Sequence, residues 1–209
     1  MLRVTNIGFV TWEEIMHKSI RGLALAAAAI ASANAIAQKA EMPAPDSFKA
    51  GDKWEWRQVD NRTKLEEGRG ARTVVEVDGV RVFSDGTINS PISNAFIGEP
   101  STKPWRVWPL EVGKKWVFDM DWSRPDGVTG NTTQNAEVVA YEEVSTPAGK
   151  FMAYKIEHRG FFKNSNGRTG KQNDTYWYAP EVSSDVKRVR EDTSNMYTRE
   201  LTTYKRAAP

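Results

Sequence analysis

Few residues in this sequence have side chains that could do chemistry. Beyond residue 37 there is one histidine, His158. An imidazole can act as a general base near neutral pH, but no G-x-S-x-G or H-E-x-x-H motif accompanies it. His158 falls on the same face of a predicted strand as Tyr154 and Ile156, since alternate residues of a strand share a face. We therefore favour a structural histidine, half-buried or at a rim, over a catalytic one.

Two further patterns resemble binding motifs but lack essential parts. Asp119 and Asp121 begin a segment similar to a calcium loop, but Arg124 stands where the loop glycine belongs and no bidentate glutamate follows. The solvent face of a strand explains the two carboxylates better. Gly68-Arg69-Gly70 lacks the third glycine of a nucleotide-binding loop. The sequence thus predicts no catalytic residue, no metal site and no cofactor.

The aromatic side chains are the one surplus that suggests binding. The sequence has eight tryptophans, of which only Trp12 precedes residue 38. Each large ring can bury ~150–250 Å², so core packing is the first interpretation. In the second, some rings line a concave apolar face that holds an acyl chain, another lipid or a sugar. The predicted lining residues are Trp54, Trp56, Trp116, Phe118, Trp122 and Trp177.

Alternating strands would have to position these rings. Residues 53–57 alternate apolar and charged side chains, and Trp116, Phe118, Met120 and Trp122 share one predicted face. Asp78-Gly79 between two β-branched runs predicts a tight hairpin. Further strands are expected at 136–144, 151–162, 174–179, 185–191 and 197–205, and a single helical turn at 93–97.

This spacing predicts a mainly β domain of about nine or ten short strands. The strands would form a single antiparallel, curved sheet, closed as a barrel, open as a half-barrel, or folded as a sandwich. We expect a flexible arm at 38–50, rich in Pro and Ala, and one β domain at 51–209.

Charge and cysteine content exclude several classes. The 29 Lys and Arg nearly balance the 27 Asp and Glu, so no broad positive field is available for nucleic acid. The sequence has no cysteine. This excludes disulfides, thiolate catalysis, cysteine-based zinc sites and the lipid-modified cysteine of a bacterial lipoprotein.

Residues 1–37 have the pattern of a secretory signal peptide, with a signal helix. Lys18 and Arg21 precede an apolar run, and small residues then offer cleavage after Ala37 or Ala35. The run is too short to span a bilayer, which takes ~20 helical residues, so no transmembrane span is expected in the mature protein. Because residues 1–15 fit the pattern less well, we expect translation to start at Met16.

Three segments carry a resemblance to a known family. They are Trp108–Trp116 (WPLEVGKKW), Val144–Ile156 (VSTPAGKFMAYKI) and Thr175–Val182 (TYWYAPEV), followed by Val186-Lys187. Together they resemble exported bacterial β-proteins of unknown function with the signature P-L-x-V-G-x-x-W … T-P-A-G-x-F-x-A-x-K-I … Y-W-Y-A-P-x-V … V-K. The sequence departs from this signature at Ser183-Ser184, where a glycine is more usual. The resemblance implies a curved antiparallel sheet, loosely similar to the half-barrels of periplasmic lipoprotein carriers, and no enzyme activity.

Three functional hypotheses remain open. The leading one is a periplasmic or secreted, non-enzymatic domain that binds a hydrophobic, lipid-like ligand or an envelope protein. The second is a carbohydrate-binding module, which needs two or three exposed, coplanar Trp or Tyr rings. The third is a hydrolase, which needs two carboxyl groups ~5–10 Å apart in one cleft.

Overall fold

The chain divides into two units, Met1–Ile36 and Ala37–Pro209, in a computed structural model. The structure describes residues 39–98, 103–193 and 195–207, all in the second unit. The predicted signal peptide with its helix, and both cleavage sites, therefore lie outside the described residues. Within the described ranges, no helix combines the length and apolar character needed to cross a membrane.

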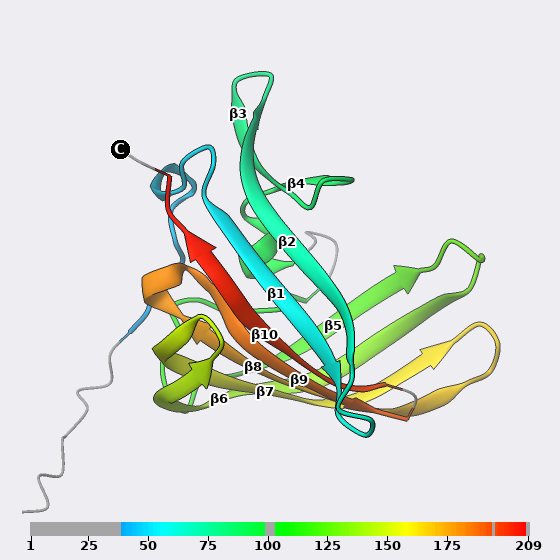
Figure 1. The fold of residues 1–209 in the computed structure, drawn as a ribbon. Helices are drawn as coiled ribbons and strands as arrows, with labels where there is room; N and C mark the ends of the chain where they lie inside the picture. The colour runs from blue at the N-terminus through cyan, green and yellow to red at the C-terminus, as the bar shows by residue number, and fades with distance from the viewer. Residues whose placement is uncertain (1–38, 99–102, 194, 208–209) are drawn as a thin grey trace, which may run out of the picture. The chain divides into compact units, whose positions relative to one another are not determined.

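One antiparallel sheet contains all ten strands, in the order β4-β3-β2-β1-β10-β9-β8-β7-β6-β5 (Figure 1). The strands are β1 (Lys53–Asp60), β2 (Glu66–Val77), β3 (Val80–Ser84), β4 (Asn89–Pro91), β5 (Lys115–Ser123), β6 (Thr129–Thr146), β7 (Gly149–Asn164), β8 (Thr169–Ala179), β9 (Ser184–Asp192) and β10 (Met196–Lys205). Strands consecutive in the chain pair along each half, and the pairing of β1 with β10 joins the halves. The edge strands β4 and β5 are not paired with each other. The predicted curved sheet is confirmed in its open form, and the closed barrel and the sandwich are not formed.

Two strands are much longer than the short strands we expected. β6 has 18 residues and β7 has 16. The first part of β6, Thr129–Asn135, has no apolar alternation, so the sequence did not predict a strand there. Its backbone is nevertheless paired with β5 on one side and β7 on the other. Two neighbouring ladders satisfy its N–H and C=O groups and fix its conformation.

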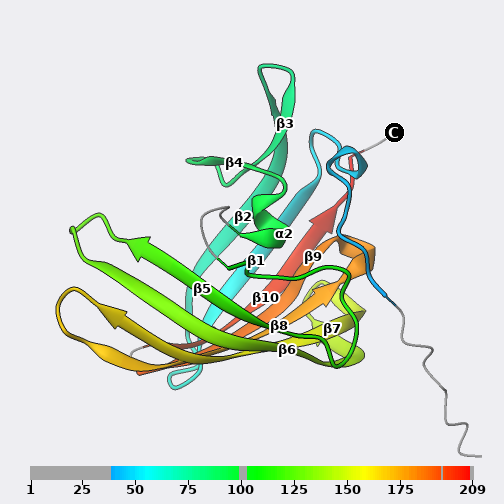
Figure 2. The ribbon, with the colours of Figure 1, turned by 180° about the vertical axis from the view of Figure 1, so that it is seen from behind.

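The local signals for turns are confirmed. β2 and β3 are joined by Asp78 and Gly79, whose φ angles of 51° and 75° are the positive values that a type I′ turn requires. The single helical turn is α2 (Asn94–Ile97). Figure 2 shows α2 and β4 on the inner side of the curved sheet.

The segment at 38–50, expected to be a flexible arm, makes packing contacts in the part of it that the structure describes. Ala40 exchanges two backbone hydrogen bonds with Leu110, of 3.0 and 2.8 Å. A 3₁₀ turn, η1 (Pro45–Ser47), then leads to Phe48, which is completely buried. The Phe48 ring packs edge-on against Phe83 at a centroid distance of 5.3 Å. One apolar side chain therefore anchors a segment whose Pro and Ala content suggested a loop.

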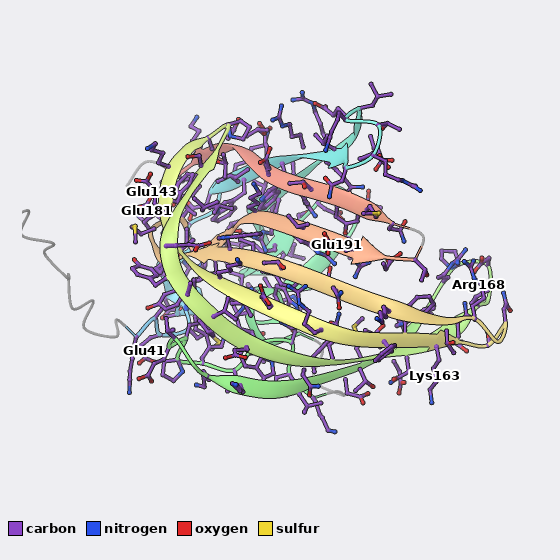
Figure 3. All side chains as sticks on the ribbon, turned by 90° about the horizontal axis from the view of Figure 1, so that it is seen from below. Glu41, Glu143, Lys163, Arg168, Glu181 and Glu191 are labelled. Atoms are coloured by element: carbon purple, nitrogen blue, oxygen red, sulfur yellow. The ribbon has the colours of Figure 1, made fainter. Side chains whose placement is uncertain are left out.

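The core lies along the inner face of the sheet. Alternation on β5 is as predicted, because Phe118 is buried while the neighbouring Val117 is exposed. A second 3₁₀ turn, η2 (Pro180–Val182), joins β8 to β9. In Figure 3, the labelled Lys163 and Arg168 lie at one end of the sheet, near the β7–β8 turn. Glu143 lies toward the opposite end.

Candidate functional site

A pocket of about 380 Å³ opens on the inner side of the sheet. One wall comes from the central strands β1, β2, β8, β9 and β10 of the sheet. The other comes from β3, β4 and α2, which contribute Phe83 and Phe96. Both phenylalanines are 2% exposed and belong to the core, so this apolar wall is held rigidly. The pocket size falls in the ~300–1,000 Å³ range of small-molecule sites.

The sheet wall of the pocket is basic. Two guanidinium groups lie beside the Trp56 ring, with the Cζ atom of Arg72 at 5.2 Å and that of Arg199 at 4.7 Å from its centroid. Trp56 is itself fixed, because its indole N–H donates to the carbonyl oxygen of Asp185 at 3.0 Å. Arg72 donates to Ser184 Oγ at 2.6 Å. Among the described residues, neither Arg72 nor Arg199 forms an ion pair with a carboxylate.

A third guanidinium in the pocket is already neutralised. Arg106 is 2% exposed, and its Nη2 donates to Asp185 Oδ1 at 2.8 Å. Its Cζ lies 4.3 Å from the ring centroid of Trp105 and 5.0 Å from that of Tyr178. Stacking of a guanidinium group on aromatic rings is favourable, and it leaves the N–H groups at the edge of the guanidinium plane free for hydrogen bonds.

Burial, with a smaller effect of neighbouring arginines, lowers the pKa values of two guanidinium groups in the pocket. Burial, together with Arg199 and Arg106, lowers the pKa of Arg72 to about 10, although Asp185 opposes the shift. Burial and the nearby Arg188 also lower the pKa of Arg199. Burial is the first cause of both shifts, so they show that these two guanidinium groups lie largely out of water.

A buried ionic cluster lies beside the pocket. Asp174 is 1% exposed and pairs with Arg188 at 2.8 Å and with Arg190 at 3.0 Å. Gln134 and Gln172 donate to its second oxygen. Burial would raise the pKa of Asp174, but the two arginines hold it below its usual range.

His158 is more deeply buried than expected, at 1% exposure rather than half-buried or at a rim. Its ring packs edge-on against Trp116, Phe118 and Tyr176 at centroid distances of 5.2 to 5.8 Å. Burial and Arg106 lower its pKa to about 3, so the imidazole is neutral at physiological pH. The structural interpretation of this histidine therefore fits its surroundings.

Of the six residues predicted to bind a ligand, only Trp56 lines this pocket. Trp54 is completely buried and donates its indole N–H to the Val182 carbonyl at 2.8 Å. Trp177 lies on the opposite face of β8 from Tyr176, where its N–H reaches Glu142 Oε1 at 2.9 Å. These three tryptophans therefore do not share one surface.

The remaining predicted residues lie on β5, outside the pocket. Phe118 is 6% exposed. Trp116 donates to the Trp105 carbonyl at 3.2 Å, and Trp122 donates to Thr132 Oγ1 at 3.1 Å. The structure thus divides the six predicted residues between the pocket (Trp56), the core beneath it (Trp54), the outer face (Trp177) and β5 (Trp116, Phe118 and Trp122).

Sequence reasoning missed the residues that give the pocket its charge, Arg72, Arg106, Arg188 and Arg199. One signal was present in the sequence. Arg72 is two residues from the buried Val74 and therefore shares the inner face of β2 with it. A charged residue in register with core residues is unusual and marks a candidate site.

The carboxylates considered for calcium have another role. Asn131 Nδ2 donates to both Asp119 and Asp121 at 2.8 Å on the surface of the β5–β6 pair. Among the residues that the structure describes, no group of three or more His, Asp or Glu side chains is placed to hold a metal ion.

The fold and the site define a class: an open antiparallel β-sheet with a basic, aromatic-lined pocket on its inner face. No protein-family model matches the chain, and no curated protein does. A solved structure from Parabacteroides distasonis, described as a "putative lipoprotein", has a similar fold, with a TM-score of 0.51 and 12% identity over 80% of this chain and 100% of that one. A second, from Bacteroides fragilis, described as a "putative exported protein with YmcC-like fold", gives a TM-score of 0.42 and 14% identity over 81% and 100%. At 12% identity the first likeness extends to the fold alone.

Proposed function

We propose that this protein is an exported, non-enzymatic β-domain that binds a hydrophobic, lipid-like small molecule in the inner-face pocket. The pocket carries the proposal. It is large enough for a small ligand, and Trp56, Phe83 and Phe96 supply apolar surface that is fixed by the core around it. Rigid aromatic walls reduce the entropy lost on binding.

Export is supported by the signal-like residues 1–37 and by the description of the similar structure from Parabacteroides distasonis as a "putative lipoprotein". We place the domain outside the cytoplasm on that basis, in the periplasm or secreted. The absence of cysteine from the sequence means that a lipid-modified cysteine is not its anchor. An envelope protein remains the alternative partner.

The carbohydrate hypothesis has less support. None of the described tryptophans is among the exposed large side chains. Six of their indole N–H groups donate to protein oxygen atoms. A row of exposed, coplanar rings is therefore not offered by the described part of the chain.

Native mass spectrometry and solvent extraction of the purified protein test the proposal directly. We expect a co-purifying ligand, or saturable binding of the neutral fluorescent probe N-phenyl-1-naphthylamine. Ala95→Trp should abolish probe binding, because Ala95 lines the pocket and an indole would fill it. Met152→Trp, at an exposed position outside the pocket, is the matched control and should bind normally. If the folded protein carries no ligand and binds no probe, the proposal is refuted.

A further inference from the structure

Positive charge exceeds negative charge in and beside the pocket. Five guanidinium groups gather on this part of the inner face, those of Arg72, Arg106, Arg188, Arg190 and Arg199. Two described carboxylates pair with them, Asp185 with Arg106, and Asp174 with both Arg188 and Arg190.

The pocket is also lined by a second carboxylate, Asp85, and by one lysine, Lys187, and both already have partners. Asp85, at the rim, accepts the backbone N–H groups of Thr87 and Ile88. Lys187 pairs with Glu200 at 3.4 Å. The surplus of positive charge therefore lies on the guanidinium groups, above all on those of Arg72 and Arg199 beside Trp56.

Two buried guanidinium N–H donors of the pocket also lack acceptors in the described part of the chain. The Nε atoms of Arg72 and Arg106 have no hydrogen-bond partner among the described residues. Leaving a buried charged donor unsatisfied is unfavourable, and an oxygen acceptor there removes the penalty. An arginine fork matches the two oxygens of a carboxylate or phosphate, and charge-assisted bonds of this kind are the stronger hydrogen bonds of proteins.

The wall next to Arg72 is apolar, and the Arg72 Cζ atom lies 4.5 Å from the ring centroid of Phe83. Phe83 and Phe96 are core residues of this wall, and Ile88 lies at its exposed end. A ligand that satisfies both walls must have an anionic end and an apolar end.

We infer that the ligand is a single-chain amphiphile with a carboxylate or phosphate head group. The head binds Arg72 and Arg199 beside Trp56, and the chain lies along Phe83 and Phe96. This inference rests on the proposed function and narrows it from hydrophobic molecules in general to anionic amphiphiles.

Competition against N-phenyl-1-naphthylamine tests the inference with four small molecules. Decanoate and decyl phosphate carry the two candidate head groups, 1-decanol carries the same chain without charge, and inorganic phosphate carries a head group without a chain. We expect one or both anionic amphiphiles to compete at least about ten-fold more strongly than decanol, which corresponds to one charge-assisted hydrogen bond. The stronger of the two identifies the head group. Inorganic phosphate should not compete.

Two variants assign the head-group site. Arg199→Gln should weaken the preferred anion about ten-fold or more, while probe and decanol binding stay unchanged. Gly70→Ala keeps every charge, but its Cβ would lie 2.9 Å from Arg199 Nη2 and must displace that guanidinium. It should weaken the same anion less than Arg199→Gln does. Arg159→Gln is the control, because Arg159 pairs with Glu157 on the outer face and should leave all affinities unchanged.

The outcomes separate this inference from the proposed function. If decanol competes as well as decanoate and decyl phosphate, the anionic head group is wrong while hydrophobic binding stands. If inorganic phosphate competes as well as decyl phosphate, the amphiphile is wrong and the pocket is a site for small anions. If Arg199→Gln retains the anion preference, the head-group position is wrong. Both proposals are refuted only if the unmodified, folded protein carries no ligand and binds no probe.

Discussion

Replacing Asp174 by asparagine should destabilise the protein strongly, because it removes the one carboxylate between two inner-face arginines. Asp174 Oδ1 accepts hydrogen bonds from Arg188 at 2.8 and 3.1 Å and from Arg190 Nε at 3.0 Å. Asparagine keeps the shape of the side chain but not its charge. Both guanidinium groups would then be left beside each other without a counter-charge.

The expected loss follows from the burial of the three groups. Removing one partner of a buried ion pair typically costs ~3–5 kcal/mol. Asp174 is 1% exposed, but the side chains of Arg188 and Arg190 are 24% and 23% exposed, so water can partly solvate the freed cations. We therefore expect the lower end, about 3 kcal/mol, from a total of ~5–15 kcal/mol for a domain.

Urea denaturation at pH 7, followed by tryptophan fluorescence, measures this loss. Arg190→Met should cost only about 1 kcal/mol, because Asp174 and Arg188 remain as a balanced pair. Asp119→Asn is the surface control, at about 0.5 kcal/mol or less, since its carboxylate lies on the outer face. A loss below about 1 kcal/mol for Asp174→Asn would refute the claim that this carboxylate holds the cluster together.

The cluster of Asp174, Arg188 and Arg190 also predicts how the stability of the protein changes at acid pH. The folded-state pKa of Asp174 is lowered, so its stabilisation is complete above the ordinary aspartate pKa near 3.8 and is lost as the pH falls below it. Asp174→Asn should flatten the decline of the unfolding free energy in that acid range. An unchanged decline would contradict the assignment.

Three further predictions concern other parts of the chain. Trp54→Ala should cost about 3–5 kcal/mol in chemical denaturation, because the ring is completely buried and hydrogen-bonded; Trp177→Ala, on the outer face, should cost clearly less. The pKa of His158 is lowered from 6.5 to about 3, so the unfolding free energy should fall as the pH decreases from 6.5 toward 3, and His158→Phe should remove that part of the pH dependence, as measured by denaturation at several pH values. Intact-mass analysis of the exported protein should find a chain that begins after Ala37 or Ala35, and a retained leader would contradict the signal-peptide prediction.

Local chemistry in the sequence was enough to predict the turns and the alternating strands. Asp78-Gly79 predicted the hairpin, because few other residue pairs accept two positive φ angles. It was not enough where pairing depends on distant segments. Glu66–Arg72 and Thr129–Asn135 are polar, and only their neighbours β1, β5 and β7 make them strands.

The sequence by itself determined the class of fold, because period-2 alternation on strands such as β5 requires one buried face. It also showed an aromatic surplus, but not which rings would meet a ligand. Only the tertiary structure decided which ring lines the pocket, by burying Trp54, turning Trp177 outward and leaving Trp56 at the pocket wall. Arg72 and Arg199 are far apart in the chain. They come to lie beside the same ring, Trp56 of β1, because β1 pairs with β2 on one side and with β10 on the other. The physical reason is that strand pairing is non-local, so a site built across strands exists only once the sheet has formed.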